Sequence, residues 1–209
     1  MPIHSYNDIW PSAGRGVFLA PGAHLTGDVV LGDDVSFWFH TAARGDVHRI
    51  RIGSSTNVQD GSILHVSYQT HPLEIGDRVS IGHSAMVHGC VIESGALIGI
   101  GARVLDGACI EQEAQIGAGA VVAPGHRVPA RSLALGVPAR VVRPLTDAEL
   151  ANNRAISDRY VRLKDEYSQR LGSGWNRLEA VVESGPDTRA AGGIELTGNP
   201  PAETPQAQR

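Results

Sequence analysis

The sequence has little cysteine, no long apolar stretch and no excess of basic residues, and each shortage excludes a class of protein. Two cysteines cannot build the disulfide framework of a small secreted domain. No uninterrupted apolar run reaches the roughly 18 residues of a membrane-spanning helix, and the N-terminus lacks the pattern of a signal peptide. The 18 Lys and Arg against 22 Asp and Glu give a net charge of −4, which does not attract nucleic acid. We therefore expect a cytoplasmic protein that binds neither membranes nor nucleic acid.

Glycine is abundant instead, with 25 residues in a chain of 209, and it does not follow the every-third-residue period of collagen. This composition indicates many turns. The length suits one domain with an appendage.

A period of six residues runs through the chain. Apolar residues, most of them large and here called anchors, recur in one register, and from Ile92 to Val122 a small residue stands two positions before each anchor. The anchors are Leu19, Leu25, Leu31, Phe37, Ala43, Ile52, Val58, Leu64, Ile75, Ile81, Val87, Ile92, Ile98, Val104, Ile110, Ile116, Val122 and Val128. The small residues are Cys90, Ala96, Ala102, Ala108, Ala114 and Ala120. The breaks in the register predict loops or corners.

A six-residue period fits neither a helix of 3.6 residues per turn nor a plain alternating strand, but it suits a short strand plus a turn. Three such units make one coil of about 18 residues in a parallel β-helix, whose interior the anchors fill. Glycines after anchors, as in Ile98-Gly99, are expected at the corners. The sequence therefore predicts an all-β solenoid over residues 17–136, preceded by an N-terminal segment over residues 1–16. The period leaves the handedness of the coil open.

After the solenoid the pattern changes. Thr146 and Glu149 have the spacing of a capping box, which predicts an amphipathic helix over residues 146–171. Its apolar side should lie along the outer face of the coils, either of its own chain or of a neighbouring copy. Residues 183–209 are rich in Gly, Pro and polar residues, and we expect this tail to be disordered.

Three histidines, His65, His83 and His88, lie close together in the middle of the solenoid. His65 and His88 each follow an anchor directly, so their side chains should leave the coil in similar directions, whereas His83 stands two positions after its anchor. Three His ligands and an open position are typical of catalytic zinc. Because the chain has nine His, the spacing alone leaves both a metal site and a chance cluster open.

The segments Arg44-Gly45-Asp46, Asn57 to Gly61, Leu64-His65-Val66 and Ile81 to Cys90 resemble the gamma-class carbonic anhydrase family and its bacterial relatives. The resemblance covers about residues 8–170. It implies a left-handed parallel β-helix, a homotrimer, and one metal ion at each subunit interface. The metal would be Zn2+, with Fe2+ or Co2+ possible in the same site. His65 and His88 would come from one protomer and His83 from its neighbour.

The resemblance also implies a reaction, in which a metal-bound hydroxide attacks CO2 to give bicarbonate. Gln59 and Asn57 match polar residues around the metal-bound water, and Gln59 could orient the hydroxide or the CO2. Arg44, Asp46 and Asp60 match residues that form ion pairs and polar contacts between protomers.

Tyr160 resembles a tyrosine of the C-terminal helix near the family's site, with helix packing as the alternative role. The sequence departs from the best-characterised form of the family where a proton must leave. The family's acidic loop corresponds to the short stretch 66–74, and a further family glutamate is Val47 here. His71 or Glu74 could substitute as a shuttle.

Three alternatives to a carbonic anhydrase stay open, and the departure at Val47 and in the 66–74 stretch motivates the second and the third. The first is a hexapeptide acyltransferase that uses CoA, because the same repeat builds those enzymes. The second is a thioesterase acting on CoA esters. The third is a metal-bearing trimeric scaffold with little activity.

Overall fold

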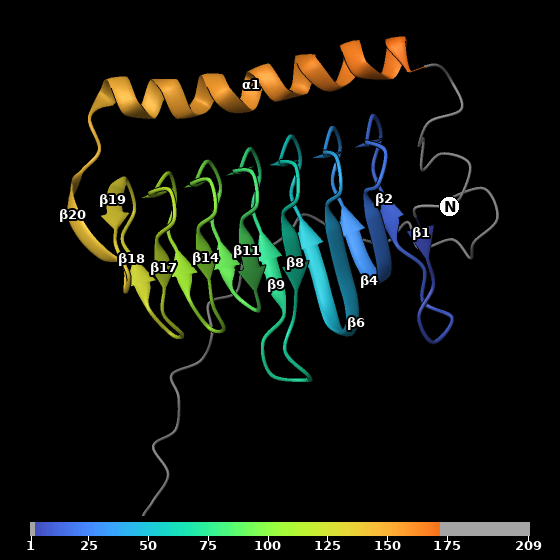
Figure 1. Cartoon of the computed structure of the whole chain (residues 1–209), viewed down its shortest axis with the longest axis horizontal. Coiled ribbons are helices and arrows are strands. Elements are labelled where there is room, and N and C mark those ends of the chain that lie inside the picture. The colour runs from blue at the N-terminus through green and yellow to red at the C-terminus, as the bar shows by residue number, and fades with distance from the viewer. Residues whose placement is uncertain (1–2, 172–209) are drawn as a thin grey trace, which may run out of the picture.

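The computed structural model describes residues 3–171 and shows a left-handed parallel β-helix of about seven turns with one long helix lying along it (Figure 1). The predicted fold class is confirmed. Residues 1–2 and the expected tail over 183–209 lie outside the described residues.

The strands form two sheets that wrap around the solenoid. The twelve-stranded sheet contains β1 (Ile3–His4), β2 (Ser12–Ala13), β4 (His24–Leu31), β6 (Ala42–Ile52), β8 (Ile63–His65), β9 (Leu73–Ile75), β11 (Met86–His88), β12 (Val91–Ile92), β14 (Arg103–Val104), β15 (Cys109–Ile110), β17 (Val121–Val122) and β18 (Arg127–Val128). The eight-stranded sheet contains β3 (Phe18–Leu19), β5 (Ser36–Phe37), β7 (Asn57–Val58), β10 (Ser80–Ile81), β13 (Leu97–Ile98), β16 (Gln115–Ile116), β19 (Ser132–Leu135) and β20 (Arg140–Pro144). Strand β6 bends so that its first part pairs with β8 and its last part with β9. The larger sheet thereby supplies two sides of each coil and the smaller sheet the third.

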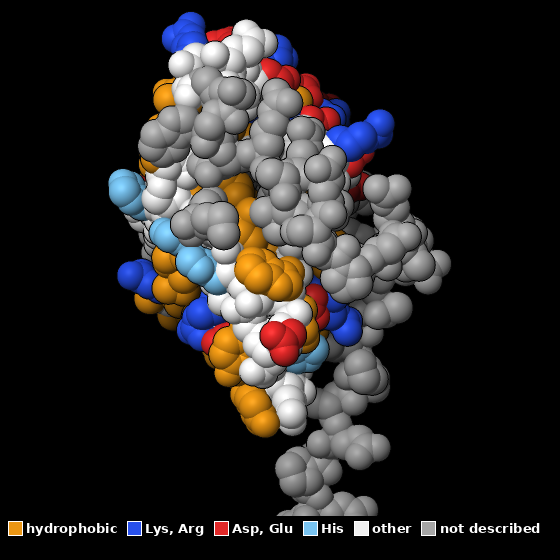
Figure 2. Space-filling view, turned by 90° about the vertical axis from the view of Figure 1, so that its right-hand side faces the viewer, with side chains coloured by type: hydrophobic (Ala, Val, Ile, Leu, Met, Phe, Trp, Pro, Cys, Tyr) orange, Lys and Arg blue, Asp and Glu red, His pale blue; other side chains and the backbone are white. Residues whose placement is uncertain are grey.

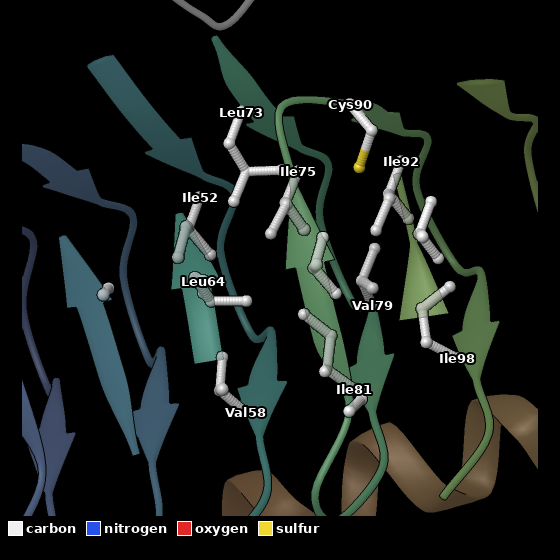
Figure 3. Packing of buried hydrophobic residues seen from close by; sticks show 14 of the residues in the cluster. Ile52, Val58, Leu64, Leu73, Ile75, Val79, Ile81, Cys90, Ile92 and Ile98 are labelled. Carbon is white, nitrogen blue, oxygen red and sulfur yellow. The ribbon is translucent and has the colours of Figure 1, made fainter. Parts of the chain in front are cut away.

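The anchors stack on one another from coil to coil. Ile52 pairs with Ile75, and Ile75 pairs with Ile92, in parallel register. These side chains are fully buried and point into one shared interior, together with Val58 and Ile81 from the other strands (Figure 3). The residues in the six-residue register are therefore the ones that fill the interior, because each anchor packs on the anchor of the next coil.

Two glycines on one corner have different reasons for being glycine. At Gly99 an added Cβ would lie 2.6 Å from the backbone nitrogen of Ala118 in the next coil, so the residue is needed for close approach. Gly101 has open space around it but a φ of +66°, the left-handed conformation that a side chain disfavours. The glycine after an anchor thus permits stacking, and the residue two positions later makes the turn.

The helix α1 (Asp147–Arg170) lies along the coils of its own chain, over β3, β5, β7 and β10 (Figure 1). Thr146 and Glu149 form the capping box at its start. Tyr160 and Tyr167 pack on Trp38 at ring-centroid distances of 5.3 and 5.1 Å. The contact is more polar than the amphipathic pattern indicates, since Lys164 is also buried, with its Nζ 2.9 Å from an Asp34 carboxylate oxygen.

The N-terminal segment closes one end of the stack, where β1 and β2 pair in parallel with β4. Seen from this end, hydrophobic, charged and histidine side chains share the surface (Figure 2). Tyr6, Ile9 and Trp10 are the large exposed hydrophobic residues of this segment. Within residues 3–171 we find no helix that is both long and apolar enough to cross a membrane.

Candidate metal site

His65 and His88 face each other on neighbouring strands. They occupy the same register position of β8 and β11, and the Nδ1 of His65 lies 3.0 Å from the Nε2 of His88. The two side chains keep 19% and 28% of their surface exposed, so the pair opens onto the outside of the solenoid. The structure thus places these residues as their position after an anchor predicts.

Each histidine gives its other ring nitrogen to a carboxylate. The Nε2 of His65 lies 3.0 Å from Asp46 Oδ1, and the Nδ1 of His88 lies 2.5 Å from Asp106 Oδ1. Because an ionised carboxylate only accepts hydrogen bonds, both of these ring nitrogens act as N–H donors. In the neutral rings the remaining nitrogens, His65 Nδ1 and His88 Nε2, then carry lone pairs that face each other.

Two lone pairs that face each other repel, and a cation bound between them removes the repulsion. Two nitrogen ligands of a tetrahedral zinc, at bond lengths of about 2.0–2.1 Å, lie about 3.3 Å apart, close to the 3.0 Å observed between His65 and His88. A metal-ligating histidine normally gives its second nitrogen to a carboxylate, as both do here. The donor set of this pair therefore fits a transition-metal ion.

The pKa shifts of His65 and of the two carboxylates agree with this fit. Burial lowers the pKa of His65, and the nearby Arg44 adds to the effect, so that the neutral ring is favoured despite Asp46. Burial by itself would raise the pKa of Asp46, but hydrogen bonds from His65 and Arg44 outweigh it and lower the pKa. Asp106 behaves in the same way, with Ser67 and His88 as its hydrogen-bond donors. Neutral imidazoles and ionised carboxylates are the forms that a metal site requires.

His83 lies apart from this pair, on the corner that follows β10. Its Nδ1 is 2.9 Å from Asp60 Oδ2, and both side chains are more than 40% exposed. In residues 3–171 no three or more His, Cys, Asp or Glu side chains are grouped so that they could hold a metal ion. The three predicted ligands are therefore divided, within one chain, into a pair and a separate single histidine.

The predicted polar residues Gln59 and Asn57 are buried and hydrogen-bonded to each other. The Nε2 of Gln59 donates to Asn57 Oδ1 at 3.0 Å, and Asn57 Nδ2 donates to Ser80 Oγ at 2.9 Å. Gln59 directly precedes Asp60, the partner of His83. This arrangement holds the Gln59 amide in one orientation next to the His83 corner.

Tyr160 reaches the same side of the molecule from the helix. Its ring packs edge-on against Trp38, and burial together with the nearby Asp60 carboxylate raises the pKa of its hydroxyl. The helix packing and the position near Asp60 are both present at Tyr160.

Arg44 is paired with Asp46 of its own chain, and the Arg44 side chain is 53% exposed.

Sequence reasoning missed Asp106 and Ser67. Ser67 Oγ donates to Asp106 Oδ2 at 2.6 Å, and the other carboxylate oxygen meets His88. The signal that could have found Asp106 is the coil period, because it stands 18 residues after His88. Ser67 carries no comparable signal, since the loop that holds it breaks the repeat.

The chain was compared with known proteins. No family model matches it. It is 43% identical to a carbonic anhydrase of Geobacillus kaustophilus, over 81% of this chain and 92% of that protein. It is 37% identical to the mitochondrial gamma carbonic anhydrase 2 of Arabidopsis thaliana, over 81% of this chain but only 63% of the relative's length. Among solved structures, a Bacillus cereus protein presented as a candidate acetyltransferase superposes with a TM-score of 0.77 at 41% identity, covering 79% of this chain and 95% of that one.

The fold defines a hexapeptide-repeat β-helix protein, and on its outer surface two histidine ring nitrogens face each other. The relatives carry the assignment one step further. The chain belongs to the gamma carbonic anhydrase family.

Proposed function

We propose that this protein is a gamma-class carbonic anhydrase that hydrates CO2 to bicarbonate at a metal site shared between copies of the chain. The observation that carries the proposal is the pair of facing ring nitrogens of His65 and His88, each backed by a carboxylate. The named carbonic anhydrases among its relatives support the reaction.

The third ligand in this proposal is His83 from a neighbouring copy. Two features support the division: the pair is partly exposed on one side of the coil, and His83 is 44% exposed on a separate corner. A site completed in this way is closed by a cyclic homo-oligomer, in which each copy gives the pair to one interface and His83 to the other. The homotrimer is the assembly that we propose.

His65, His88 and the neighbouring copy's His83 would hold Zn2+, which would lower the pKa of a bound water to about 7 and so provide hydroxide near neutral pH. Fe2+ or Co2+ would suit the same imidazole ligands. Asp46 and Asp106 keep His65 and His88 in the ligating tautomers. The Gln59 amide, held by Asn57, orients CO2 or the hydroxide by hydrogen bonding. Tyr160, next to Asp60, borders the reaction space.

The proton that leaves each turnover needs an acceptor from this chain. Glu74 suits this role less well, because its carboxylate accepts a hydrogen bond from Arg49 Nε at 2.8 Å. His71 lies on the 66–72 loop, close to Gly107 and Asp106. We propose His71 as the acceptor that stands in for the family's acidic residues.

An acyltransferase is the second candidate, because the Bacillus cereus structure at 41% identity is presented as one. Assays of CO2 hydration and of acetyl transfer, with and without metal, distinguish the two functions. A metal-loaded protein that hydrates CO2 and does not turn over acetyl-CoA supports the first. Acetyl transfer that persists after chelation supports the second. A thioesterase would instead hydrolyse acyl-CoA without an acceptor, and a scaffold would do none of these.

The test of the proposed function is stopped-flow CO2 hydration by protein loaded separately with Zn2+ and with Fe2+. We expect turnover that disappears on chelation and in His83→Ala. His126→Ala is the matched control, since His126 lies between β17 and β18 on another corner, and it should keep full activity. A fully metal-loaded protein without turnover would refute the proposal, as would undiminished turnover in His83→Ala.

A further inference from the structure

A chain of two hydrogen bonds connects a surface loop to one of the paired histidines. Ser67 Oγ donates to Asp106 Oδ2 at 2.6 Å, and Asp106 Oδ1 receives the Nδ1 proton of His88 at 2.5 Å. Both oxygens of the carboxylate are thereby engaged, one from each side. The Asp106 side chain therefore has one orientation, and it is set by Ser67.

The backbone leaves room for this arrangement. Asp106 lies on the corner between β14 and β15, one coil beyond His88. Its Oδ1 would lie 2.7 Å from a Cβ added at Gly89, so a side chain at Gly89 would displace the carboxylate. The absence of that Cβ lets Asp106 reach back across the corner to the His88 ring.

The loop that carries Ser67 is itself tied down. The backbone of Ser67 donates to His71 O at 3.1 Å, which closes the loop, and Gln69 N donates to Val47 O at 3.2 Å, which joins it to β6. Ser67 thus projects from a braced turn, and its hydroxyl is held beside Asp106 rather than free to rotate away.

We infer that Asp106 is a positioning residue for His88, and that Ser67 positions Asp106, so that the 66–72 loop helps to set the metal affinity of the site. The inference rests on the proposed function, because it takes His88 as a ligand. The carboxylate keeps the His88 proton on Nδ1, so that the Nε2 lone pair points toward His65. It also makes the imidazole more basic and therefore a stronger ligand for a metal ion. Asp46 supports His65 in the same way, but its second partner is Arg44, whereas the second partner of Asp106 is the hydroxyl of a loop residue.

The test is the Zn2+ affinity of the full-length protein, measured by competition with a coloured chelator. Loss of such outer partners typically weakens metal binding about 10–100-fold, which is the range expected for Asp106→Ala. Asp106→Asn should fall between the wild type and Asp106→Ala, because its amide oxygen still accepts the hydrogen bond but carries no charge. Ser67→Ala, which leaves the carboxylate in place, should weaken binding about threefold, less than either change at Asp106.

Asp77→Asn is the matched control. Asp77 is also a corner carboxylate, and its Oδ1 accepts a hydrogen bond from Ser54 N at 2.7 Å, but it lies between β9 and β10 and is exposed. Its removal should leave the Zn2+ affinity unchanged. The visible spectrum of the Co2+-loaded protein gives a second readout, since a His88 ring that has turned changes the ligand field while a remote stability loss does not.

The outcomes separate the inference from the proposed function. Wild-type affinity and an unaltered Co2+ spectrum in Asp106→Asn and Ser67→Ala would overturn the inference and leave the metal site standing. Equally weak Zn2+ binding by the wild type and His88→Ala would refute the proposed metal site and, with it, the inference. If Asp106→Ala does not fold, the two milder variants decide the question, and thermal unfolding of the metal-free proteins shows which variants are folded.

Discussion

Mixing two inactive variants tests most directly whether the metal site is divided between copies of the chain. His83→Ala removes the single histidine on its corner and keeps the pair, whereas His65→Ala breaks the pair and keeps His83. Each variant alone has no complete site in a homotrimer. In a mixed trimer a complete site forms wherever the pair of a His83→Ala copy meets His83 of a His65→Ala copy.

The size of the rescue follows from this geometry. With equal amounts of the two variants assembled at random, each half of a given interface is intact with a probability of about one half, so about one quarter of the sites are complete. The Zn2+ content and the CO2 hydration rate should both return to about one quarter of the wild-type values. A site held within one chain would give no rescue at all, because neither variant contains all three histidines.

The assay is co-refolding of the two purified variants from denaturant, followed by elemental analysis of bound zinc and stopped-flow hydration. Light scattering measures the mass of the assembly, and different affinity tags on the two variants verify that mixed assemblies form. The variants refolded separately are the controls. Mixed assemblies that bind no more zinc than these controls would refute the shared site, as would a His83→Ala protein that retains full metal by itself.

Three further predictions concern stability, each measured by urea unfolding of the metal-free protein. Gly99→Ala should lower the free energy of unfolding by about 3 kcal/mol or more, since its Cβ would meet backbone atoms at 2.6 Å. Gly101→Ala has open space and only an unfavourable φ, so it should lower the free energy of unfolding by about 1 kcal/mol. Equal losses would contradict the assignment of the two roles. Ile110→Ala should cost about 2–5 kcal/mol because the side chain is fully buried among the anchors, and a loss below 1 kcal/mol would be inconsistent with that packing. At Lys164, burial lowers the pKa, but the hydrogen bonds that its ammonium donates to Asp165 and Asp34 outweigh burial and raise the pKa above 10.5. This ion pair therefore stabilises the fold below pH 10.5, and the contribution is lost as the pH rises through the folded-state pKa. Asp34→Asn should cost about 1 kcal/mol at neutral pH, discounted because Asp34 is 45% exposed, and should flatten the alkaline decline; an unchanged decline would exclude Lys164 as its source.

Much of the fold was predictable because the repeat is local. An anchor such as Ile98 identifies its coil partner Ile116 by counting, since parallel coils pair residues at a constant offset. The repeat also predicted that His65 and His88 leave the coil in similar directions, because each directly follows an anchor, although a loop makes the offset between them 23 residues. It did not reveal which face the helix covers, because an amphipathic pattern specifies an apolar side and not the surface that receives it. The burial of Lys164 was equally hidden, since its partner Asp34 is far away in the sequence.

The pairing of His65 with His88 was open to prediction from the sequence, and the contacts that support the pair were not. Asp106 and Ser67 come together through a loop that interrupts the period, so no regular offset joins them. The roles of Gln59, Asn57, Tyr160, Arg44, Asp46 and Asp60 came from family resemblance and stay predictions.

By itself, the sequence determined the coil, its interior and the direction in which His65 and His88 leave it, because all three follow from a six-residue period that hydrogen bonding between stacked strands enforces. Only the tertiary structure decided that α1 lies on its own chain, that His83 stands apart from the pair, and that each histidine of the pair is backed by a carboxylate. The physical reason is range. Periodicity records contacts one coil away, whereas the docking of a helix, the bracing of a loop and the reach of a side chain around a corner depend on shapes that exist only after the coils have stacked.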